Sequence, residues 1–244
     1  MGKKGPTRHL KREMAPHFWP MPRKENVWAT RTGPGSHGLN VSMPLLLIVR
    51  DFLGYAETAK EASILIRQGK ICVDGKPRKD HRYSVGIMDV VELPNAKKSF
   101  RVFPELGGRL ALHPISGEEL RFKLCRIIGK TTVTDGVTQL NLHDGRNILL
   151  KDRGGEFAVN DTIKLSIPEQ EIVEHVSFKL GARVIITGGR SQGRHGILMG
   201  VGSEPGKKRT ATIRTPENED VRTMAKYIFA IGSETPMISL PGGA

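Results

Sequence analysis

The chain is poor in cysteine, in aromatic residues and in long apolar runs, and each shortage excludes a class of protein. Its two cysteines, Cys72 and Cys125, form no CxxC pair, so neither a disulfide framework nor a zinc site is predicted. Aromatic residues make up only 5% of the chain, which predicts lean cores. The longest apolar run, PLLLIV at residues 44–49, is far too short to cross a bilayer. No apolar segment of signal-peptide length follows the basic N-terminus, so we expect a cytoplasmic protein with no membrane partner.

Positive charge is abundant, in contrast. The chain has 38 Lys and Arg against 25 Asp and Glu, a formal net charge of +13. Such a charge implies a polyanionic partner, and nucleic acid is favoured because no membrane segment is present. The excess lies in residues 1–40, 41–105 and 177–212, whereas residues 106–176 are nearly neutral. We therefore expect several small domains and three basic contact surfaces.

Residues 1–40 are rich in proline and glycine and have no sustained hydrophobic period. A segment of this kind cannot offset its conformational entropy, so we expect a basic extended arm that orders on RNA. Trp19 and Trp28 lie among its cations, which suits rings stacked on bases or wedged against a neighbouring protein. The alternative is a structural arm that packs both tryptophans on its own domain. The RNA-binding residues predicted here are Lys3, Lys4, Arg8, Lys11, Arg12, Trp19, Arg23, Lys24 and Arg31.

The arm ends in GPGSHG, residues 33–38, which matches the GxGxxG dinucleotide-binding pattern letter for letter. No strand precedes this stretch and no suitable helix follows it, so the pattern lacks its required context. We interpret it as a loop, and we predict no cofactor.

Residues 41–105 predict a pair of short helices packed on a small sheet. In the first helix, Ser42 is expected to cap, Pro44 to occupy the first turn and Gly54 to end it. In the second, Thr58 and Glu61 form a capping box that satisfies backbone donors at its start.

A hairpin is predicted directly after the second helix. Gly69 ends the helix, KICV at residues 70–73 reads as a strand, and Asp74-Gly75 is a two-residue turn. Pro77 marks the returning strand as an edge. Cations gather at this junction, namely Arg67, Lys70, Lys76, Arg78, Lys79 and Arg82.

The junction LIRQGKICVDGKPR, with the later strand VGIMDVVEL, resembles the small RNA-binding module first defined in ribosomal protein four of the bacterial small subunit. In that family the helix pair and hairpin present basic residues to structured RNA. The resemblance implicates Arg50, Lys60, Arg67, Gln68, Lys70, Lys76, Arg78 and Lys79. The alternative is an ordinary solvated charged face, which does not explain why the charges concentrate at one junction.

Residues 106–176 alternate short apolar runs with turn signals such as Asp144-Gly145, which predicts a central β-rich domain. The run RLALHPI at residues 109–115 is taken as its first strand. His113, His143 and His175 lack the spacing of metal ligands, so we interpret them as structural or surface residues and predict no metal site. The near-neutral charge suggests a spacer or a protein-facing domain.

The fourth segment, residues 177–244, contains FKLGARVIITGGRSQGRHGILMGV. Its glycines imitate a phosphate loop, but Arg194 and His195 replace the required Lys and Ser or Thr, which argues against nucleotide binding. The stretch resembles the KOW motif of ribosomal proteins and elongation factors, which implies an SH3-like β-barrel. Close glycines let backbone amides approach phosphates. The predicted RNA contacts are Arg190, Arg194, His195, Lys207, Lys208 and Arg209.

Taken in order, the arm, RNA module, β-rich segment and KOW motif resemble the archaeal and eukaryotic family of small-subunit ribosomal protein four. The fold class expected is α+β and multidomain, with units 1–40, 41–105, 106–176 and 177–244. The resemblance implies a non-catalytic ribosomal protein, present as a single copy, whose partners are ribosomal RNA and neighbouring small-subunit proteins.

Two other classes share these modules. A pseudouridine synthase or related RNA-modifying enzyme uses the same RNA module, but no catalytic constellation is recognisable here. A transcription or translation factor built on a KOW barrel would not obviously need the arm or the second RNA module.

Overall fold

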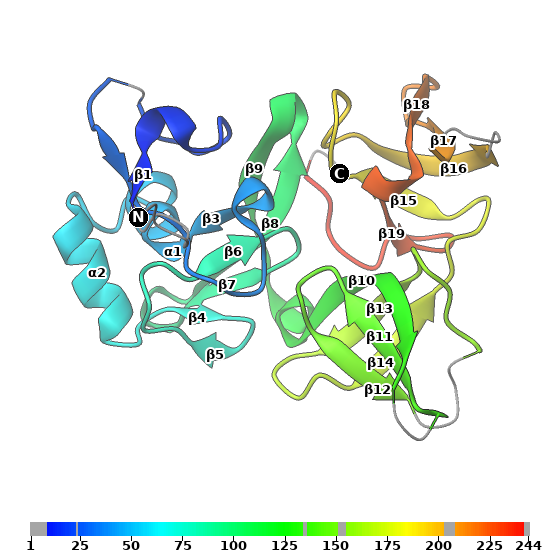
Figure 1. The fold of residues 1–244 in the computed structure, drawn as a ribbon, viewed down its shortest axis with the longest axis horizontal. Coiled ribbons are helices and arrows are strands. Elements are labelled where there is room, and N and C mark those ends of the chain that lie inside the picture. The colour runs from blue at the N-terminus through cyan, green and yellow to red at the C-terminus, as the bar shows by residue number, and fades with distance from the viewer. Residues whose placement is uncertain (1–8, 23, 134–135, 151–154, 203–207, 242–244) are drawn as a thin grey trace, which may run out of the picture.

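The structure, a computed structural model, describes residues 9–22, 24–133, 136–150, 155–202 and 208–241, and it is mostly β-structure with few helices (Figure 1). Three five-stranded antiparallel sheets organise this described part, in the orders β5-β4-β7-β8-β9, β12-β11-β10-β13-β14 and β18-β17-β16-β15-β19. In Figure 1 the first sheet lies with the helices on one side, and the other two lie above one another on the opposite side. Of the expected α+β fold, the richness in β-structure, with several sheets and few helices, is confirmed. Among the described residues no helix is long and apolar enough to span a membrane.

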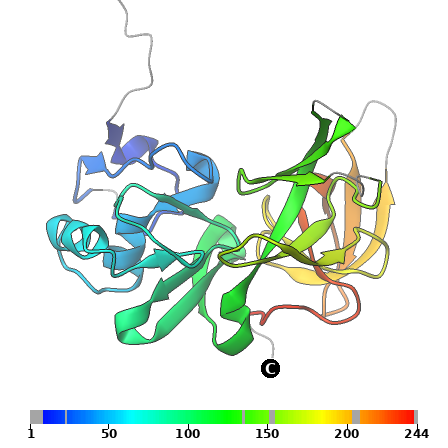
Figure 2. The ribbon, with the colours of Figure 1, turned by 90° about the horizontal axis from the view of Figure 1, so that it is seen from below.

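The arm is folded, and the prediction of an extended segment is wrong for its described part. Its elements are β1 (Leu10–Lys11), η1 (Arg12–Met14), β2 (Trp28–Ala29) and η2 (Leu39–Val41). β1 pairs with β2, and Leu10, Met21 and Trp19 belong to the same hydrophobic core as the helices of the next segment. These apolar side chains are inserted singly rather than along one face, so they leave no periodicity in the sequence. Figure 2 shows the arm on the same lobe as the helices, away from the C-terminal strands.

Trp19 is the main anchor of the arm. Its side chain is 2% exposed, and its indole Nε1 donates a hydrogen bond to the carbonyl of Ser42 at 2.9 Å. Trp28, in contrast, is 58% exposed and its ring lies beside that of His9. For Trp19 the alternative of packing on its own chain is therefore the correct one.

The second segment contains the helices and most of the first sheet. Its elements are β3 (Ser42–Pro44), α1 (Leu45–Leu47), η3 (Ile48–Phe52), α2 (Ala59–Arg67), β4 (Cys72–Val73), β5 (Lys76–Pro77), β6 (Ser84–Gly86), β7 (Val90–Leu93), η4 (Pro94–Ala96) and β8 (Lys98–Glu105). The apolar run at residues 45–49 is wholly buried and ends in the π-helical turn η3.

The start of the first helix differs from the prediction. Ser42 and Pro44 lie in β3, which pairs with β6, and the Ser42 hydroxyl donates to the Gly38 carbonyl instead of capping the helix. Pro44 precedes α1 as its N-cap residue and makes no side-chain cap. Gly54 does adopt the left-handed conformation, at φ +64°, as expected for a helix stop.

The strand expected to open the central domain belongs to the first sheet. β9 (Arg109–Pro114) forms a hairpin with β8 through η5 (Leu106–Gly108), so a boundary after residue 105 falls inside a hairpin. Alternating apolar residues predicted the strand correctly but carried no information about its partner.

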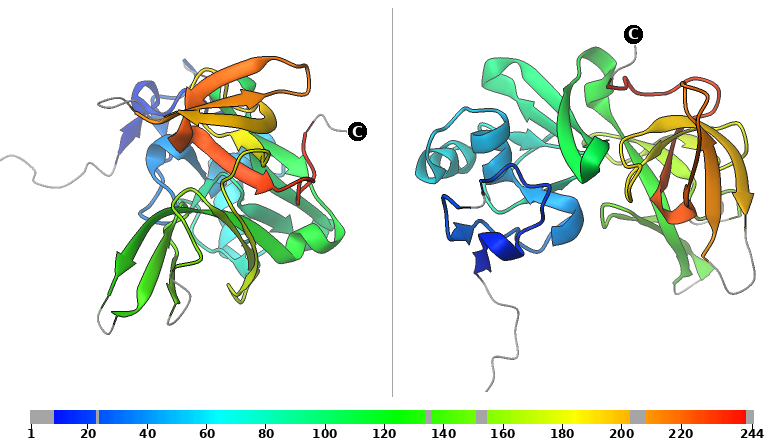
Figure 3. Two further views of the ribbon diagram at one scale, coloured as in Figure 1. Left: turned by 90° about the vertical axis from the view of Figure 1, so that its right-hand side faces the viewer. Right: turned by 90° about the horizontal axis from the view of Figure 1, so that it is seen from above.

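Each of the two remaining sheets has its own hydrophobic core. Figure 3 shows the central sheet in green and the C-terminal sheet in yellow and orange. The central elements are η6 (Gly117–Arg121), β10 (Phe122–Thr132), β11 (Thr138–Leu142), β12 (Asn147–Leu150), β13 (Thr162–Ser166) and β14 (Ile172–Val176). The C-terminal elements are β15 (Arg183–Ile186), β16 (His195–Gly202), β17 (Thr210–Arg214), β18 (Asp220–Met224), η8 (Ala225–Tyr227) and β19 (Ile228–Gly232). A further buried cluster joins all three sheets, with Phe103 from the first, Leu124 from the second and Phe229 from the third.

Trp19→Ala should lower the free energy of unfolding by about 3–5 kcal/mol, because it removes a large buried side chain and its hydrogen bond. Trp28→Ala is the matched control, and its effect should stay within about 0.5 kcal/mol because this ring is largely exposed. Urea unfolding followed by circular dichroism measures both. Equal effects of the two substitutions would contradict the folded arm.

Candidate nucleic-acid interface

The corner between helix α2 and the β4–β5 hairpin is built as its sequence predicts. The Thr58 hydroxyl accepts from the Glu61 amide, and the Glu61 carboxylate accepts from the Thr58 amide, which completes the capping box. Gly69 ends the helix at φ +71°. Asp74 and Gly75 form the turn with φ values of +51° and +70°, and β5 is an edge strand. The backbone of the corner is therefore fixed by local chemistry.

Four cations project from this corner into solvent. Arg67, Lys70, Lys76 and Lys79 are exposed, and within the described part of the chain none of them has an ion pair. Lys60 and Gln68 are also exposed on α2. Free cations held on a rigid corner are suited to contact phosphate groups of a folded nucleic acid.

Three other predicted cations of this segment are already engaged. Arg50 makes two hydrogen bonds to Asp51, at 2.8 and 3.0 Å. Arg82 donates to the carbonyl of Arg31 at 3.0 Å. The guanidinium of Arg78 lies over the ring of Tyr83, 4.3 Å from its centre. These three side chains help to build the surface, and each is restricted in its orientation by the contact it makes.

A fully buried lysine lies directly behind the hairpin. The ammonium group of Lys123, in β10, donates to Asp74 at 2.9 Å and to Asp89, and it lies 3.0 Å from Asp144. Burial alone would lower the pKa of Lys123, but Asp89 and Asp74 outweigh it and raise that pKa well above its usual value. We call Lys123, these three aspartates, His37 and Arg146 the buried charge cluster.

The buried charge cluster ties five segments of the chain together, one of them β10 with Lys123. Asp74 belongs to the turn of the basic hairpin, Asp89 precedes β7, and Asp144 lies in the turn between β11 and β12. His37, in the GPGSHG loop at the end of the arm, lies 3.0 Å from Asp89 through its Nε2, and Arg146 pairs with Asp74 and Asp144. The cluster therefore fixes the hairpin relative to the central sheet.

The buried charge cluster was missed by the sequence analysis, which assigned Asp74 to turn chemistry alone. A signal was present, because Lys123 interrupts the apolar start of β10 in the run FKLC at residues 122–125. A lysine in a buried strand requires buried anions. Its partners come from three separate turns, and no local pattern identifies them.

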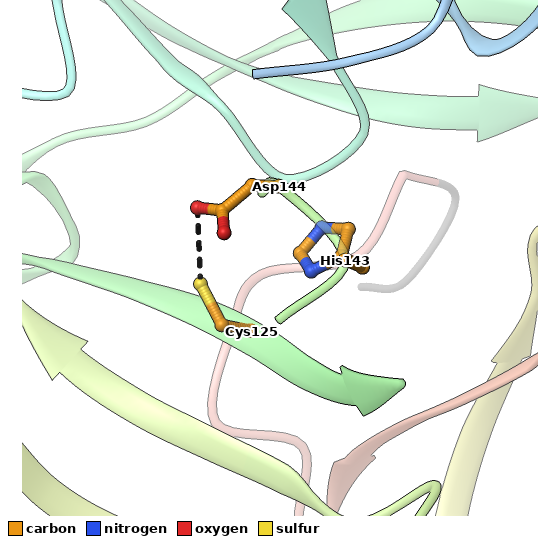
Figure 4. A group of neighbouring side chains, drawn as sticks. All are labelled: Cys125, His143 and Asp144. Carbon is orange, nitrogen blue, oxygen red and sulfur yellow. Dashed lines mark hydrogen bonds between the residues drawn. The ribbon is translucent and has the colours of Figure 1, made fainter. Parts of the chain in front are cut away.

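Three neighbouring residues beside Lys123 are of the types that bind metal ions. Ligand atoms of Cys125, His143 and Asp144 all lie within 4.8 Å of one another. Figure 4 shows these three side chains. The Cys125 thiol donates to Asp144 at 3.5 Å, and burial raises its pKa well above the usual value. His143 accepts from the Arg126 amide at 3.2 Å through Nδ1, and its Nε2 lies 3.2 Å from the Ile87 carbonyl.

These three side chains do not fit a metal ion. Burial lowers the pKa of His143 to about 3, so it is a neutral ring with both nitrogens engaged. Asp144 already faces Lys123 and Arg146, and Cys125 is held as a thiol rather than the thiolate that a metal needs. The group is a structural part of the core.

In the arm, the predicted contact residues divide into three groups. Trp19 and Arg12 are corrections: both are buried, and the Arg12 guanidinium donates to the carbonyl of Met21. Neither side chain is available to RNA in this conformation. Lys11 and Lys24 are exposed, and Arg31 is half-buried. The remaining predicted residues, Lys3, Lys4, Arg8 and Arg23, lie outside the described part of the chain.

The glycine-rich loop before β16 is occupied by another part of the protein. Gly193, at φ +88°, lies against the backbone of Glu105 and Leu106, so closely that a Cβ atom would stand 2.6 Å from the Glu105 carbonyl carbon. Gln192 donates to the carbonyl of Arg109 at 2.9 Å. At this point the loop therefore docks on the β8–β9 hairpin, and the expectation that its glycine approaches phosphates is wrong for Gly193.

The cations of this last segment remain partly accessible. Arg190, Lys208 and Arg209 are exposed, and His195 is half-buried. Arg194 forms an ion pair with Glu219 at 2.7 Å. Lys207 lies outside the described residues.

Comparison with known proteins identifies the family. Residues 4–40 match the RS4NT (NUC023) domain, residues 43–91 the S4 domain, and residues 96–172 the model of ribosomal family S4e. A relative from Methanothermobacter thermautotrophicus, "Small ribosomal subunit protein eS4", is 46% identical over 97% of this chain and 97% of its own. The chain belongs to the ribosomal family S4e.

Other members of the S4e family agree with this assignment. "Small ribosomal subunit protein eS4" of Desulfurococcus amylolyticus is 46% identical over the full length of both chains. The crystal structure of the 30S ribosomal protein S4e from Thermoplasma acidophilum is similar to this fold, with a TM-score of 0.67 and 29% identity, covering 79% of this chain and 95% of that one. The family resemblance found in the sequence is thereby confirmed.

Lys123→Met should lower the free energy of unfolding by about 3–5 kcal/mol, because it leaves buried aspartates without their shared cation. Lys179→Met removes an exposed lysine of the same size and should change the stability by less than about 0.5 kcal/mol. Urea unfolding at pH 7 measures both. A wild-type-like stability of Lys123→Met would show that the cluster does not hold the sheets together.

Acid should destabilise the protein through the same cluster. Burial opposes ionisation, but Lys123 and its neighbours lower the pKa of Asp144 to about 2, and His37 and Lys123 hold that of Asp89 well below its usual value. Carboxyl groups with lowered pKa stabilise the fold above their unfolded pKa of about 4, and this contribution is lost as the pH falls towards 2. Asp144 alone should account for about 2 kcal/mol.

Urea unfolding at pH 7, 4 and 3 tests this acid dependence. Asp144→Asn should be less stable at pH 7 and should lose less stability between pH 4 and 3 than the unsubstituted protein. An equal loss in both would exclude Asp144 as a source of the acid sensitivity.

Proposed function

We propose that this protein is a structural, non-catalytic constituent of the small ribosomal subunit, and that it binds folded ribosomal RNA. The observation that carries the proposal is the end-to-end similarity to relatives named small ribosomal subunit protein eS4, at 41–46% identity. The four free cations on the α2–hairpin corner supply the matching chemistry. The other expected partners are the ribosomal proteins beside it in the subunit. Each cytoplasmic ribosome would contain a single copy of this protein.

The contact surface would combine three regions. The corner with Arg67, Lys70, Lys76 and Lys79 is the first, and exposed cations of the arm, including Lys11 and Lys24, form the second. The third is the C-terminal body, for which we propose an SH3-like KOW barrel presenting Arg190, Lys208 and Arg209. We retain the four units of the sequence analysis, with the β9 strand moved into the second unit.

Binding would depend on phosphate neutralisation at preset positions. Each cation that neutralises a phosphate releases counterions, so affinity should fall with salt by a slope of roughly 0.7–0.9 per contact. The corner is rigid before RNA arrives, because its turns are locally determined and Asp74 is anchored on Lys123. Little conformational entropy of the corner's backbone then remains to be lost when RNA binds.

An RNA-modifying enzyme and a KOW-barrel transcription or translation factor are less favoured. Relatives that match this chain over 97–100% of both lengths carry the ribosomal name. The charged groups of the buried charge cluster are paired with one another, which is unlike catalytic groups that must act on a substrate.

Co-sedimentation with small subunits through a high-salt wash tests the proposal. The protein should remain bound, whereas release at modest salt would indicate a transient factor or enzyme. Arg67→Gln, Lys70→Gln and Lys79→Gln together should weaken binding to a small-subunit RNA transcript and reduce the salt slope by roughly 2–3.

A matched control removes the same charge elsewhere, by Lys97→Gln, Lys98→Gln and Lys179→Gln, all at exposed positions outside the corner. This control should bind nearly as the unsubstituted protein does. Equal weakening of RNA binding by both triple variants would show that only net charge matters. It would contradict the corner as a specific contact surface.

A further inference from the structure

A polar cavity of about 240 Å³ lies where the basic hairpin meets the arm loop and the central sheet. Its lining includes Lys76 and Arg78 from the hairpin strand and its end, Arg146 from the turn between β11 and β12, and Ser36 from the arm loop. Gln170, exposed on the loop between β13 and β14, lies at the same cavity. Three cations from two different sheets therefore share one hollow.

Arg78 lies in the wall of this cavity and has one unpaired donor atom. Its guanidinium lies over the Tyr83 ring, 4.3 Å from the centre, and this contact restricts its orientation. The Nε atom of Arg78 is buried, and no described residue provides a hydrogen-bond partner for it. A buried donor without a partner is costly, and an acceptor bound in the cavity would relieve that cost.

The charge balance of the cavity favours an anion. Asp74 and Asp144 also lie in its wall, but both are paired with Lys123 behind the wall and with Arg146. The charges of Lys76 and Arg78 have no such partner among the described residues. The excess is positive, and planar guanidinium donors match the oxygens of phosphate.

We propose that this cavity binds one phosphate group, supplied by the backbone of RNA. The site would join Lys76 and Arg78 of the RNA-binding module to Arg146 and Gln170 of the central body, whose near-neutral charge predicts a spacer or a protein-facing domain. A single phosphate there would contact two sheets and the arm loop at once. The inference rests on the proposed function, because that function provides the RNA.

Gln170→Glu tests the site without replacing a member of the buried charge cluster. It adds one negative charge at the cavity, at an exposed residue with φ +70°. The matched control is Asn218→Asp, which adds the same charge at an exposed residue with φ +60° in the C-terminal body. Gln170→Glu should weaken binding to a small-subunit RNA transcript about fivefold, the factor for one like-charge contact at about 4 Å in water.

Arg78→Gln provides a second measurement. It should reduce the slope of log affinity against log salt by roughly 0.7–0.9, the loss of one phosphate contact. If the unsubstituted protein binds the transcript but neither substitution differs from Asn218→Asp, the cavity is not an RNA site, although the proposed function stands. If the unsubstituted protein does not bind the transcript, the proposed function itself fails, and the proposal falls with it.

Inorganic phosphate distinguishes the two possible sources of the group. It should bind the RNA-free protein weakly in isothermal titration calorimetry at constant ionic strength, and Gln170→Glu should reduce that binding. Phosphate binding that is sensitive to Gln170→Glu, together with RNA binding that is not, would assign the cavity to a free anion and overturn the RNA proposal.

Discussion

The arrangement of the sheets in this protein depends on the ion pairs between the ammonium group of Lys123 and three buried aspartates. The ammonium group is fully buried, and it meets carboxylates that come from three separate turns. Removing any one member would leave a buried charge without its partner, which costs far more than an exposed ion pair contributes. The cluster therefore constrains how the hairpin, the loop before β7 and the central sheet sit relative to one another. Hydrophobic contact is non-directional and would not impose that constraint as strictly.

Two close backbone contacts extend this constraint across the molecule. Gly75, next to Asp74 in the hairpin turn, lies against Ile167, where a Cβ atom would come within 2.7 Å of the Ile167 side chain. Gly193 makes the equivalent contact between the glycine-rich loop and the β8–β9 hairpin. Both glycines have positive φ, and at both positions a Cβ atom would collide with the neighbouring segment. Two independent reasons therefore exclude other residues. Together with the shared core around Phe103, they couple the three sheets.

This construction suits a protein that binds a folded polyanion at several points. Distances between phosphates in structured RNA are set by the RNA, and cations on a flexible scaffold would have to be ordered at each contact. Here, the cations at the end of α2 and on the hairpin are held by a capping box, a glycine stop and an anchored turn. The proposed phosphate cavity would add a contact at the one place where this rigid corner meets the central body. The described part of the arm packs on the same lobe, where Trp19 is its anchor.

Local sequence determined the elements whose signals are local: the capping box of Thr58, the stop at Gly69, the Asp-Gly turn, the edge strand at Pro77 and the family itself. The same signals could not assign β9 to its sheet, because alternation specifies a strand but not its partner. They also missed the folded arm, whose apolar residues enter the core one at a time. Only the tertiary structure decided that Trp19 and Arg12 are buried, that Gly193 faces a hairpin and that Lys123 meets Asp74. Each of these depends on residues distant in sequence, brought together when the sheets pack.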